Sequence, residues 1–340
     1  MIEVKDLTKK YGEQTVVNHL SFSIENGHVY GFLGPNGAGK STTMNIMTGC
    51  LAATSGEVSI DGHDIFEEGK IAKKQIGYLP EIPPLYIDQT PLEYLEFVAE
   101  AKGILRKNRD AEIDRVIAET HIEDVTEKLI KHLSKGYRQR VGIAQALLGN
   151  PEMIILDEPT VGLDPQQILE IRDLIRELGK THTVILSSHI LSEVQALCDK
   201  ILIIHKGNLV AFEDTEKLAD RFAGKPMVEI VVEGQKEELE SILTSDEDVE
   251  SVNIKEEKDG ALQATVTLKT QDNRAYCAKV TEVLVAHHMV LYKVLPVRAT
   301  LEDIFLELTN AEATEAPEQP TAPEATEASE QTGADEEVAE

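Results

Sequence analysis

The sequence is poor in features on which several common functions depend. It has no Trp, and aromatic residues make up only 4% of it, which disfavours stacking platforms for single-stranded nucleic acids. Lys and Arg number 33 against 61 Asp and Glu, giving a net charge of -28. Because such a chain repels phosphate backbones overall, we expect no nucleic acid among its partners.

Cysteines and long apolar runs are also scarce. Cys50, Cys198 and Cys277 are far apart and form no CxxC pair, which argues against a disulfide framework and against structural zinc. No charged-then-apolar leader opens the chain, and no apolar run reaches the roughly 18 residues needed to span a bilayer. We therefore expect a cytoplasmic protein that meets a membrane only through a partner.

Residues 311–340 differ in composition from the rest of the chain. They contain ten acidic residues, no basic ones and Val338 as their one large apolar residue. Such a segment cannot offset its ordering entropy by burial, so it is predicted to be a disordered acidic tail. A solubilising extension is favoured here over an interaction tail.

Residues 1–222 alternate apolar strand-like runs with helical patterns, which indicates an α/β domain. Between about residues 82 and 150 the pattern becomes helical, which predicts an inserted helical subdomain. Several strands end in glycine or polar residues, and open parallel sheets bind ligands at such carboxyl ends. The buried strands are predicted at Val29–Leu33, Met153–Leu156, Thr183–Leu186 and Ile201–Ile204.

Residues 226–310 form a second unit whose elements follow the order strand, helix, strand, strand, helix, strand, with Asp259 and Gly260 as a hairpin turn. This order predicts a small α+β domain of the ferredoxin-like type. A last amphipathic helix is predicted from Leu301, Ile304, Phe305 and Leu308. Docking of this helix on its own domain is favoured over contact with a partner.

The most specific motif lies between a predicted strand and a predicted helix. It fits the P-loop pattern G-x-x-x-x-G-K-[ST], in which backbone N–H groups and a helix N-terminus converge on triphosphate oxygens. Lys40 is predicted to reach the β and γ phosphates, Ser41 to ligate Mg²⁺, and Thr42 to contact the α phosphate. The motif reads Gly34, Pro35, Asn36, Gly37, Ala38, Gly39, Lys40, Ser41 and Thr42.

Polar residues that suit ATP hydrolysis follow two other strands. Asp157 ends the strand Met153–Leu156 and is the candidate Mg²⁺ partner, directly or through water. The next residue, Glu158, is the candidate that orients or deprotonates the attacking water. His189 follows the strand Thr183–Leu186 and is placed to bond the γ phosphate, although a lone histidine there is more often structural.

With these elements in this order, the sequence resembles the ATP-binding subunits of ABC transporters over residues 1–220. The signature segment of that family is matched by Leu133 to Arg140, its D-loop by Asp164, and its adenine-stacking aromatic residue by Tyr11. The resemblance implies that Ser134 and Gly136 contact the γ phosphate of ATP held by a second subunit.

Three positions depart from the family pattern. Lys135 and Tyr137 stand where the signature has a glycine and its glutamine, a form that resembles the drug-export-type subfamily. Glu81 stands where the Q-loop glutamine is expected, and its carboxylate is retained as a candidate for Mg²⁺ or water. The Pro83-Pro84 pair stiffens the loop that follows.

The resemblance implies a mechanism as well as a fold. ATP and Mg²⁺ would be bound between two chains arranged head to tail, with a homodimer expected, and hydrolysis would reopen the dimer. An integral membrane permease would receive this motion and hold the chain at the cytoplasmic face of the membrane. The alternative is a soluble ATP-switched module acting on ribosomes or DNA, which the acidic charge and the single nucleotide domain disfavour.

Overall fold

A computed structural model describes residues 1–215, 217, 226–256, 261–270 and 272–297. The predicted last helix at 301–308, the Asp259-Gly260 turn and the acidic tail lie outside these residues. The described part before residue 218 is an α/β unit with two sheets, and the part from 226 to 297 is described separately below.

A six-stranded sheet forms the centre of the first unit. Its order is β10-β9-β3-β8-β7-β6, and all neighbours are parallel except β10, which pairs antiparallel with β9. The predicted buried strands are confirmed, although β8 continues two residues further than predicted, to Ser188. The strands are β3 (Val29–Leu33), β6 (Ile76–Leu79), β7 (Met153–Leu156), β8 (Thr183–Ser188), β9 (Lys200–His205) and β10 (Asn208–Asp214).

Both faces of this sheet are buried, which explains why its central strands are almost continuously apolar. Along β7, Ile154 and Leu156 belong to one hydrophobic cluster, while Met153 and Ile155 belong to the other. The first cluster packs against helices and the second against a smaller sheet. The helices of the first unit are α1 (Lys40–Met47), α2 (Gly69–Ala72), α3 (Pro91–Ala101), α4 (Arg106–Thr120), α5 (Lys135–Leu147), α6 (Pro165–Gly179) and α7 (Leu191–Leu197).

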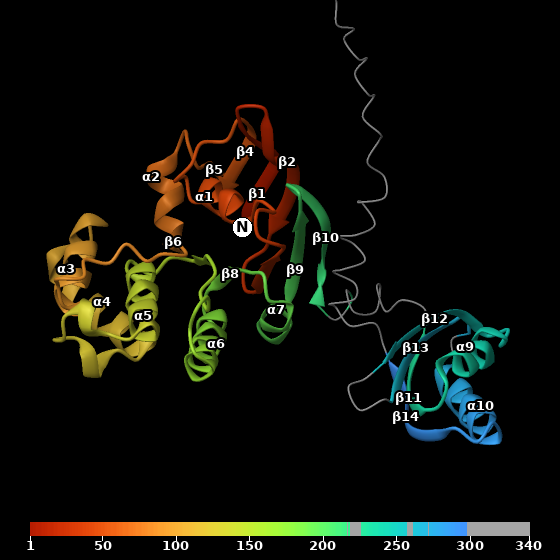
Figure 1. The fold of residues 1–340 in the computed structure, drawn as a ribbon. Coiled ribbons are helices and arrows are strands. Elements are labelled where there is room, and N and C mark those ends of the chain that lie inside the picture. Colours follow the sequence, from red (N-terminus) through yellow and green to blue (C-terminus); the bar gives the residue numbers. More distant parts are fainter. Residues whose placement is uncertain (216, 218–225, 257–260, 271, 298–340) are drawn as a thin grey trace, which may run out of the picture.

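The smaller sheet is antiparallel and was not among the predicted elements. Its order is β2-β1-β4-β5, and its apolar side chains enclose those of α1, including Met44 and Met47. This places the helix that follows the P-loop motif beside both sheets (Figure 1). The strands are β1 (Ile2–Tyr11), β2 (Gln14–Ile24), β4 (Ser55–Ile60) and β5 (His63–Asp64).

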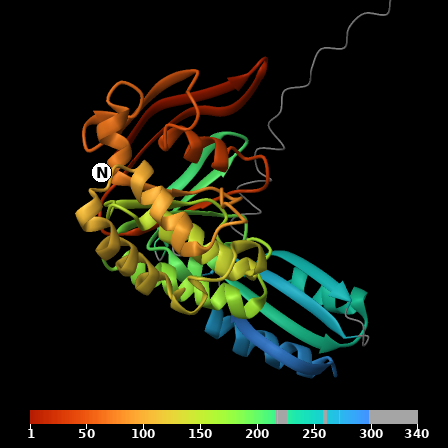
Figure 2. The ribbon, with the colours of Figure 1, turned by 90° about the vertical axis from the view of Figure 1, so that its left-hand side faces the viewer.

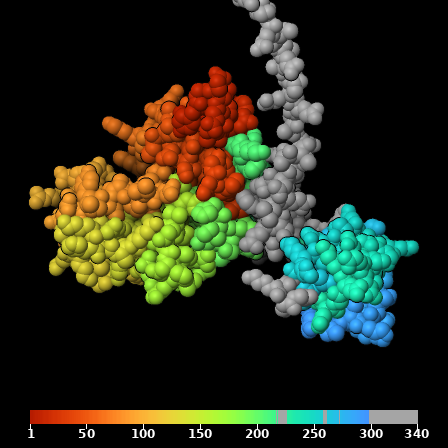
Figure 3. All heavy atoms as spheres, viewed as in Figure 1, coloured from red at the N-terminus to blue at the C-terminus, as the bar shows by residue number. Residues whose placement is uncertain are grey.

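Helices α3, α4 and α5 lie together beyond the β6 end of the central sheet (Figures 1 and 2). Thr90 and Glu93 begin α3 with a reciprocal capping box, which satisfies orphan N–H groups at the helix start. In the space-filling view, residues 1–75 lie above the helices of residues 90–180 (Figure 3). Short 3₁₀ turns are η1 (Lys73–Gln75), η2 (Glu123–Val125) and η3 (Ile130–His132).

Residues 226–297 build a four-stranded antiparallel sheet in the order β12-β13-β11-β14. Alternate residues of β11 and β13, such as Val228, Ile230 and Val266, share one buried cluster with Leu239 and Leu284 of the two helices. The elements are β11 (Met227–Glu233), α9 (Lys236–Thr244), β12 (Val249–Glu256), β13 (Leu262–Leu268), α10 (Asn273–Ala286) and β14 (Val290–Val297).

Candidate functional site

The glycine-rich loop between β3 and α1 requires glycine for two separate reasons. Gly39, the N-cap of α1, has a φ of 104°, where a side chain is strained. At Gly34, a Cβ atom would lie 2.3 Å from the carbonyl oxygen of Ile204 on β9. The loop is therefore held close against the sheet. The first N–H groups of α1, which have no intrahelical acceptor, lie where the loop ends.

Lys40 opens α1 and is only 5% exposed. Its Nζ donates to the carbonyl oxygen of Gly34 at 2.8 Å and to that of Pro35 at 3.4 Å. It also lies 3.4 Å from Oε1 of Glu158. The ammonium is thus fixed beneath the loop, in contact with the carboxylate of Glu158, the predicted water-activating residue.

The side chains of Ser41, Asp157 and Ser187 meet at the start of α1 and the carboxyl ends of β7 and β8. Ser41 Oγ donates to Asp157 Oδ1 at 3.1 Å, and Ser187 Oγ donates to the same oxygen at 2.6 Å. Mg²⁺ in nucleotide sites takes one or two protein oxygens, and water and phosphate oxygens complete its coordination. The oxygens of Ser41 and Asp157 fit that requirement.

Glu158 adopts a backbone conformation that is rare for a residue with a side chain, with a φ of 48°. Such a conformation costs about 1–3 kcal/mol and persists only where the surroundings enforce it. The N–H of Glu158 donates to Ser187 Oγ at 2.8 Å. Ser187 therefore holds both adjacent carboxylate residues, Asp157 through its side chain and Glu158 through its backbone.

Glu158 is 7% exposed, and its carboxylate lies between the His189 ring and the Lys40 ammonium. His189 Nδ1 is 2.9 Å from Oε2, so with a proton on Nδ1 the histidine donates to Glu158. Lys40 lies against the other carboxylate oxygen. A carboxylate held in this way is oriented but still has lone pairs for a water molecule, which is the arrangement that a water-positioning base needs.

A cavity of about 340 Å³ collects most of the predicted site residues. Gly34, Pro35 and Asp157 contact its lining residues through the hydrogen bonds given above. Val161 and Val16 also line it, and neither was predicted. The predicted residues that line it are Asn36, Gly37, Ala38, Gly39, Lys40, Ser41, Thr42, Glu81, Glu158 and His189.

Other predicted residues lie elsewhere. Ser134 and Gly136, at the start of α5, share a separate hollow of about 220 Å³ with Asp164. Ser134 caps α5 by accepting from the N–H of Tyr137, and Asp164 caps α6 by accepting from that of Gln167. Tyr11 ends β1, is 51% exposed and lies beneath the Nζ of Lys9. One chain thus carries two separate groups of candidate site residues.

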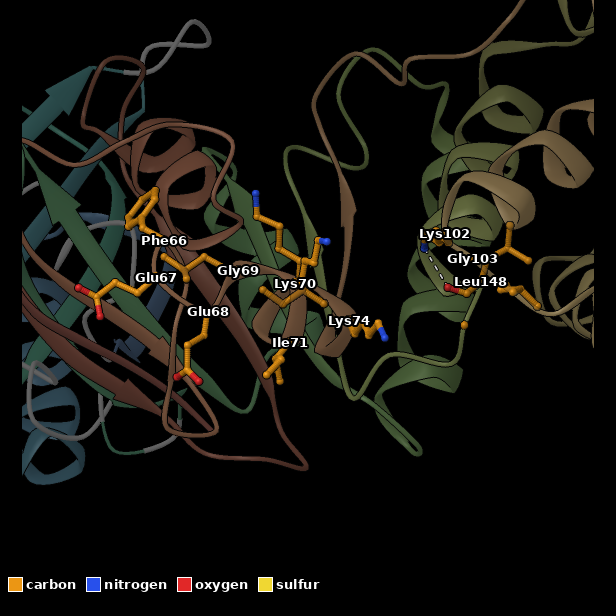
Figure 4. Close-up of a pocket in the computed structure, with 15 residues that line it drawn as sticks. Phe66, Glu67, Glu68, Gly69, Lys70, Ile71, Lys74, Lys102, Gly103 and Leu148 are labelled. Atoms are coloured by element: carbon orange, nitrogen blue, oxygen red, sulfur yellow. Dashed lines mark hydrogen bonds between the residues drawn. The ribbon is translucent and has the colours of Figure 1, made fainter.

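A hollow larger than the phosphate cavity lies away from the P-loop. A cleft of about 1150 Å³ has Phe66, Lys70 and Ile71 on one side and Lys102 with Leu148 on the other (Figure 4). Lys102 Nζ donates to carbonyl oxygens at the end of α5, including that of Leu148 at 2.9 Å, and burial lowers its pKa to about 8. Four lysines, two glutamates (Glu67 and Glu68) and apolar side chains line the cleft.

Four residues that support the site were not predicted from the sequence. Ser187 and Ser188 precede His189 at the end of β8, and that pair of hydroxyls at a strand end was their only sequence signal. Thr160 and Glu193 are buried and bonded to each other. No group of three or more His, Cys, Asp or Glu residues that suits a metal occurs within the described ranges. Nor does this part of the chain contain a helix with the length and apolarity to cross a bilayer.

The chain is similar to known proteins over most of its length. The ABC transporter family profile matches residues 17–161. The bacitracin transport ATP-binding protein BcrA of Bacillus licheniformis is 36% identical over 310 residues, which are 91% of this chain and 97% of that protein. The chain belongs to the ABC transporter ATP-binding subunits. The linearmycin resistance ATP-binding protein LnrL of Bacillus subtilis (strain 168) is 32% identical over 91% of this chain and 98% of its own length.

Solved structures give the same family. The ATP-binding subunit of an ABC transporter matches with a TM-score of 0.59 and 32% identity, over 65% of this chain and 93% of that one. The ATP-binding cassette MJ0796, a dimer in a post-hydrolysis state bound to ADP and Pi, matches with a TM-score of 0.57 and 27% identity, over 63% and 99%. The predictions of an ABC ATP-binding fold, ATP binding and ATPase activity are confirmed. ABC ATP-binding subunits dimerise and work with membrane permeases.

Proposed function

We propose that this ABC ATP-binding subunit powers an export transporter by closing and reopening a head-to-tail dimer of two copies. The observation that carries the proposal is the separation of the two groups of site residues within one chain. Lys40, Glu158 and His189 share the phosphate cavity, whereas Ser134 and Gly136 line a different hollow. Two chains in opposite orientation bring one group of each onto the same nucleotide.

The contacts in the cavity support the proposed residue roles, apart from that of Tyr11, which rests on the family resemblance. The loop from Gly34 to Thr42 cradles the phosphates, and Lys40 exchanges its carbonyl contacts for the β and γ phosphates. Glu158 positions the attacking water and accepts its proton. His189 contacts both Glu158 and the γ phosphate, so it reports whether that phosphate is present. Tyr11 is assigned to adenine stacking.

Mg²⁺, when bound with ATP, supplies positive charge that stabilises the transferred phosphoryl group. Ser41 would hold it, with Asp157 bound directly or through water and Glu81 contributing a further carboxylate. The hydroxyl of Ser187 fixes the Asp157 oxygen that faces Ser41, so the two candidate oxygens are oriented together. Ser41, Asp157 and Glu81 would hold the positive charge of Mg²⁺ in place, whereas Glu158 would accept the proton of the attacking water.

Ser134, Gly136 and Asp164 are assigned to the nucleotide of the second copy. The α5 N-terminus beside Ser134 presents N–H groups and a partial positive charge, which favour a γ phosphate. Loss of that phosphate removes the shared contact, and the dimer reopens. The copies are proposed to be identical because one chain holds both groups.

The partner that receives this motion is proposed to be an integral membrane permease, which holds the chain at the cytoplasmic face. Two features of the surface support this. In the loop after Glu81, Ile82 is 82% exposed, and the rings of Tyr86 and Phe97, each about half exposed, contact each other at a centroid distance of 5.1 Å. The cleft of Figure 4, whose four lysines outnumber its two glutamates, offers positive charge for an acidic segment of the same partner. Pro83 and Pro84 keep the loop stiff enough to transmit movement.

Export is proposed from the relatives, whose names refer to bacitracin and lantibiotic transport and to linearmycin resistance. Residues 1–222 are proposed as the ATP-binding domain, with residues 82–150 as its helical subdomain. Residues 226–310 are proposed as a ferredoxin-like accessory domain, consistent with its β12-β13-β11-β14 strand order. Residues 311–340 are proposed as a disordered acidic tail.

The dimer mechanism is tested with Glu158→Gln in the full-length chain. Because glutamine keeps the size of the side chain but is a much weaker base, the variant should bind ATP normally and accumulate as a dimer with ATP and Mg²⁺. Sedimentation velocity with ATP or ADP measures the dimer. Adding Ser134→Arg to the same variant should abolish the ATP-dependent dimer, since the bulky cation occupies the α5 side of the interface. A dimer that persists unchanged with Ser134→Arg contradicts the head-to-tail arrangement.

The permease partner is tested by purifying the tagged chain from its own cells in mild detergent. Recovery of an integral membrane protein is expected, and Ile82→Asp should reduce this recovery without changing ATPase activity. Leu105→Asp, which alters another apolar side chain that is 62% exposed, is the matched control. Recovery of ribosomal or DNA-associated proteins with no membrane protein would contradict the proposal.

A further inference from the structure

One buried carboxylate outside the phosphate cavity contacts three segments of the ATP-binding domain. Glu193, on α7, is 3% exposed. Its Oε2 accepts from Thr160 Oγ1 at 2.6 Å and from Ser188 Oγ at 3.1 Å. Its Oε1 lies 3.8 Å from Nη2 of Arg172 on α6. None of these four residues was singled out by its sequence pattern.

Each of these contacts involves a residue that lies close in the chain to a candidate site residue or on a helix that one caps. Thr160 is two residues after Glu158, and its carbonyl oxygen accepts from the N–H of Leu163, next to Asp164. Ser188 immediately precedes His189. Arg172 belongs to the helix that Asp164 caps. One carboxylate therefore joins the segment after the candidate base, the segment before the candidate γ-phosphate sensor, and α6.

This arrangement is poorly explained by stability alone. A buried charge is costly unless it is paired and fully hydrogen-bonded, and apolar residues of similar volume are often as stable. The pairing here is loose, since the ion pair spans 3.8 Å and the buried Nε of Arg172 has no hydrogen-bond partner among the described residues. A loosely paired buried charge, which does not favour stability, is expected at sites where function requires it.

We propose that Glu193 is a positioning residue for ATP hydrolysis, which locks the Thr160 and Ser188 segments together so that Glu158 and His189 keep their alignment. The proposal rests on the roles proposed above for Glu158 and His189. The strained backbone at Glu158 is held on one side by Ser187 and, two residues later, by the Thr160 bond to Glu193. Releasing that bond lets the Glu158 carboxylate shift relative to the water that it orients.

The test uses the full-length chain and compares kcat, KM for ATP, nucleotide affinity and thermal midpoint. Thr160→Val removes only the hydroxyl bond, Thr160→Ser keeps it, and Glu193→Gln removes the charge. Thr120→Val is the matched control, because Thr120 is also buried and donates to a carbonyl oxygen within α4, away from the site. A displacement of about 1 Å can cost about a hundredfold in rate, so a fall in kcat of about tenfold or more is expected for Thr160→Val and Glu193→Gln.

Nucleotide affinity should stay within about twofold of wild type in both variants, and Thr160→Ser should restore most of kcat. The double variant Thr160→Val, Glu193→Gln should be no slower than its slower parent, since both remove the same link. A wild-type kcat in the two variants overturns the proposal. A loss of kcat with an equal loss of nucleotide affinity also overturns it, as does a loss of kcat with a thermal midpoint far below that of Thr120→Val. The kcat of Glu158→Gln is measured in parallel. If it equals that of the wild type, Glu158 is not the base. If Glu158→Gln loses activity while Thr160→Val does not, only the role of Glu193 is refuted.

Discussion

Ser187→Ala is the most informative single substitution at the phosphate cavity, because one fully buried hydroxyl holds two candidate site residues. It accepts from the N–H of Glu158 at 2.8 Å and donates to Asp157 Oδ1 at 2.6 Å. Alanine removes both bonds. The Glu158 N–H is then buried without an acceptor, and its strained backbone loses its main restraint.

The size of the effect follows from these two bonds. A bond to a charged group contributes about 1.5–3 kcal/mol, and an unsatisfied buried donor costs about 1–3 kcal/mol, so a loss of about 3 kcal/mol is expected. For a domain of this size, that lowers the thermal midpoint by roughly 6–12 °C. Because Asp157 and Glu158 both lose their alignment, kcat should fall by about ten- to a hundredfold.

The assay pairs thermal unfolding with steady-state ATP hydrolysis over a range of Mg²⁺ concentrations. Half-maximal activity should need more Mg²⁺ in Ser187→Ala, since Asp157 is no longer oriented toward Ser41. Thr120→Val serves again as the control, with an expected loss of about 1 kcal/mol and an unchanged kcat. If Ser187→Ala unfolds no earlier than this control and hydrolyses ATP at the wild-type rate, the argument that Ser187 organises the two carboxylates is wrong.

Three further outcomes are expected. Lys40→Ala should weaken ATP binding at least about tenfold by titration calorimetry, since a buried cation no longer meets the phosphates; undiminished affinity would refute its role. Gly34→Ala should destabilise the fold by about 1–3 kcal/mol in a denaturant titration, because the new Cβ lies 2.3 Å from the Ile204 oxygen, whereas Gly69→Ala, whose Cβ meets only one side-chain atom at 3.8 Å, should not. Deleting residues 311–340 should leave ATPase activity and the thermal midpoint within error, and a clear drop in either would show that the tail contributes to the fold.

Local sequence determined the parts of this protein that depend on neighbouring residues. The run from Gly34 to Thr42 specifies a tight turn and the first turn of a helix, so its position between β3 and α1 follows from backbone conformation. The apolar run at Met153–Leu156 is long enough for one buried strand, which puts Asp157 and Glu158 at its carboxyl end. Their roles in hydrolysis stay predictions until the variants are measured.

Only the tertiary structure decided which distant residues meet. Parallel pairing of β8 with β7 brings Ser187 to Asp157 from 30 positions away, and neither residue's neighbours signal that contact. The antiparallel sheet around α1 was missed although its β1–β2 hairpin is local, with Tyr11 paired to Gln14; only the pairing of β1 with β4 (Ser55–Ile60) joins distant residues. The buried bond between Thr160 and Glu193 and the separation of Ser134 from Lys40 likewise depend on how whole elements pack. Strand pairing and packing act over distances in the chain that local patterns do not encode.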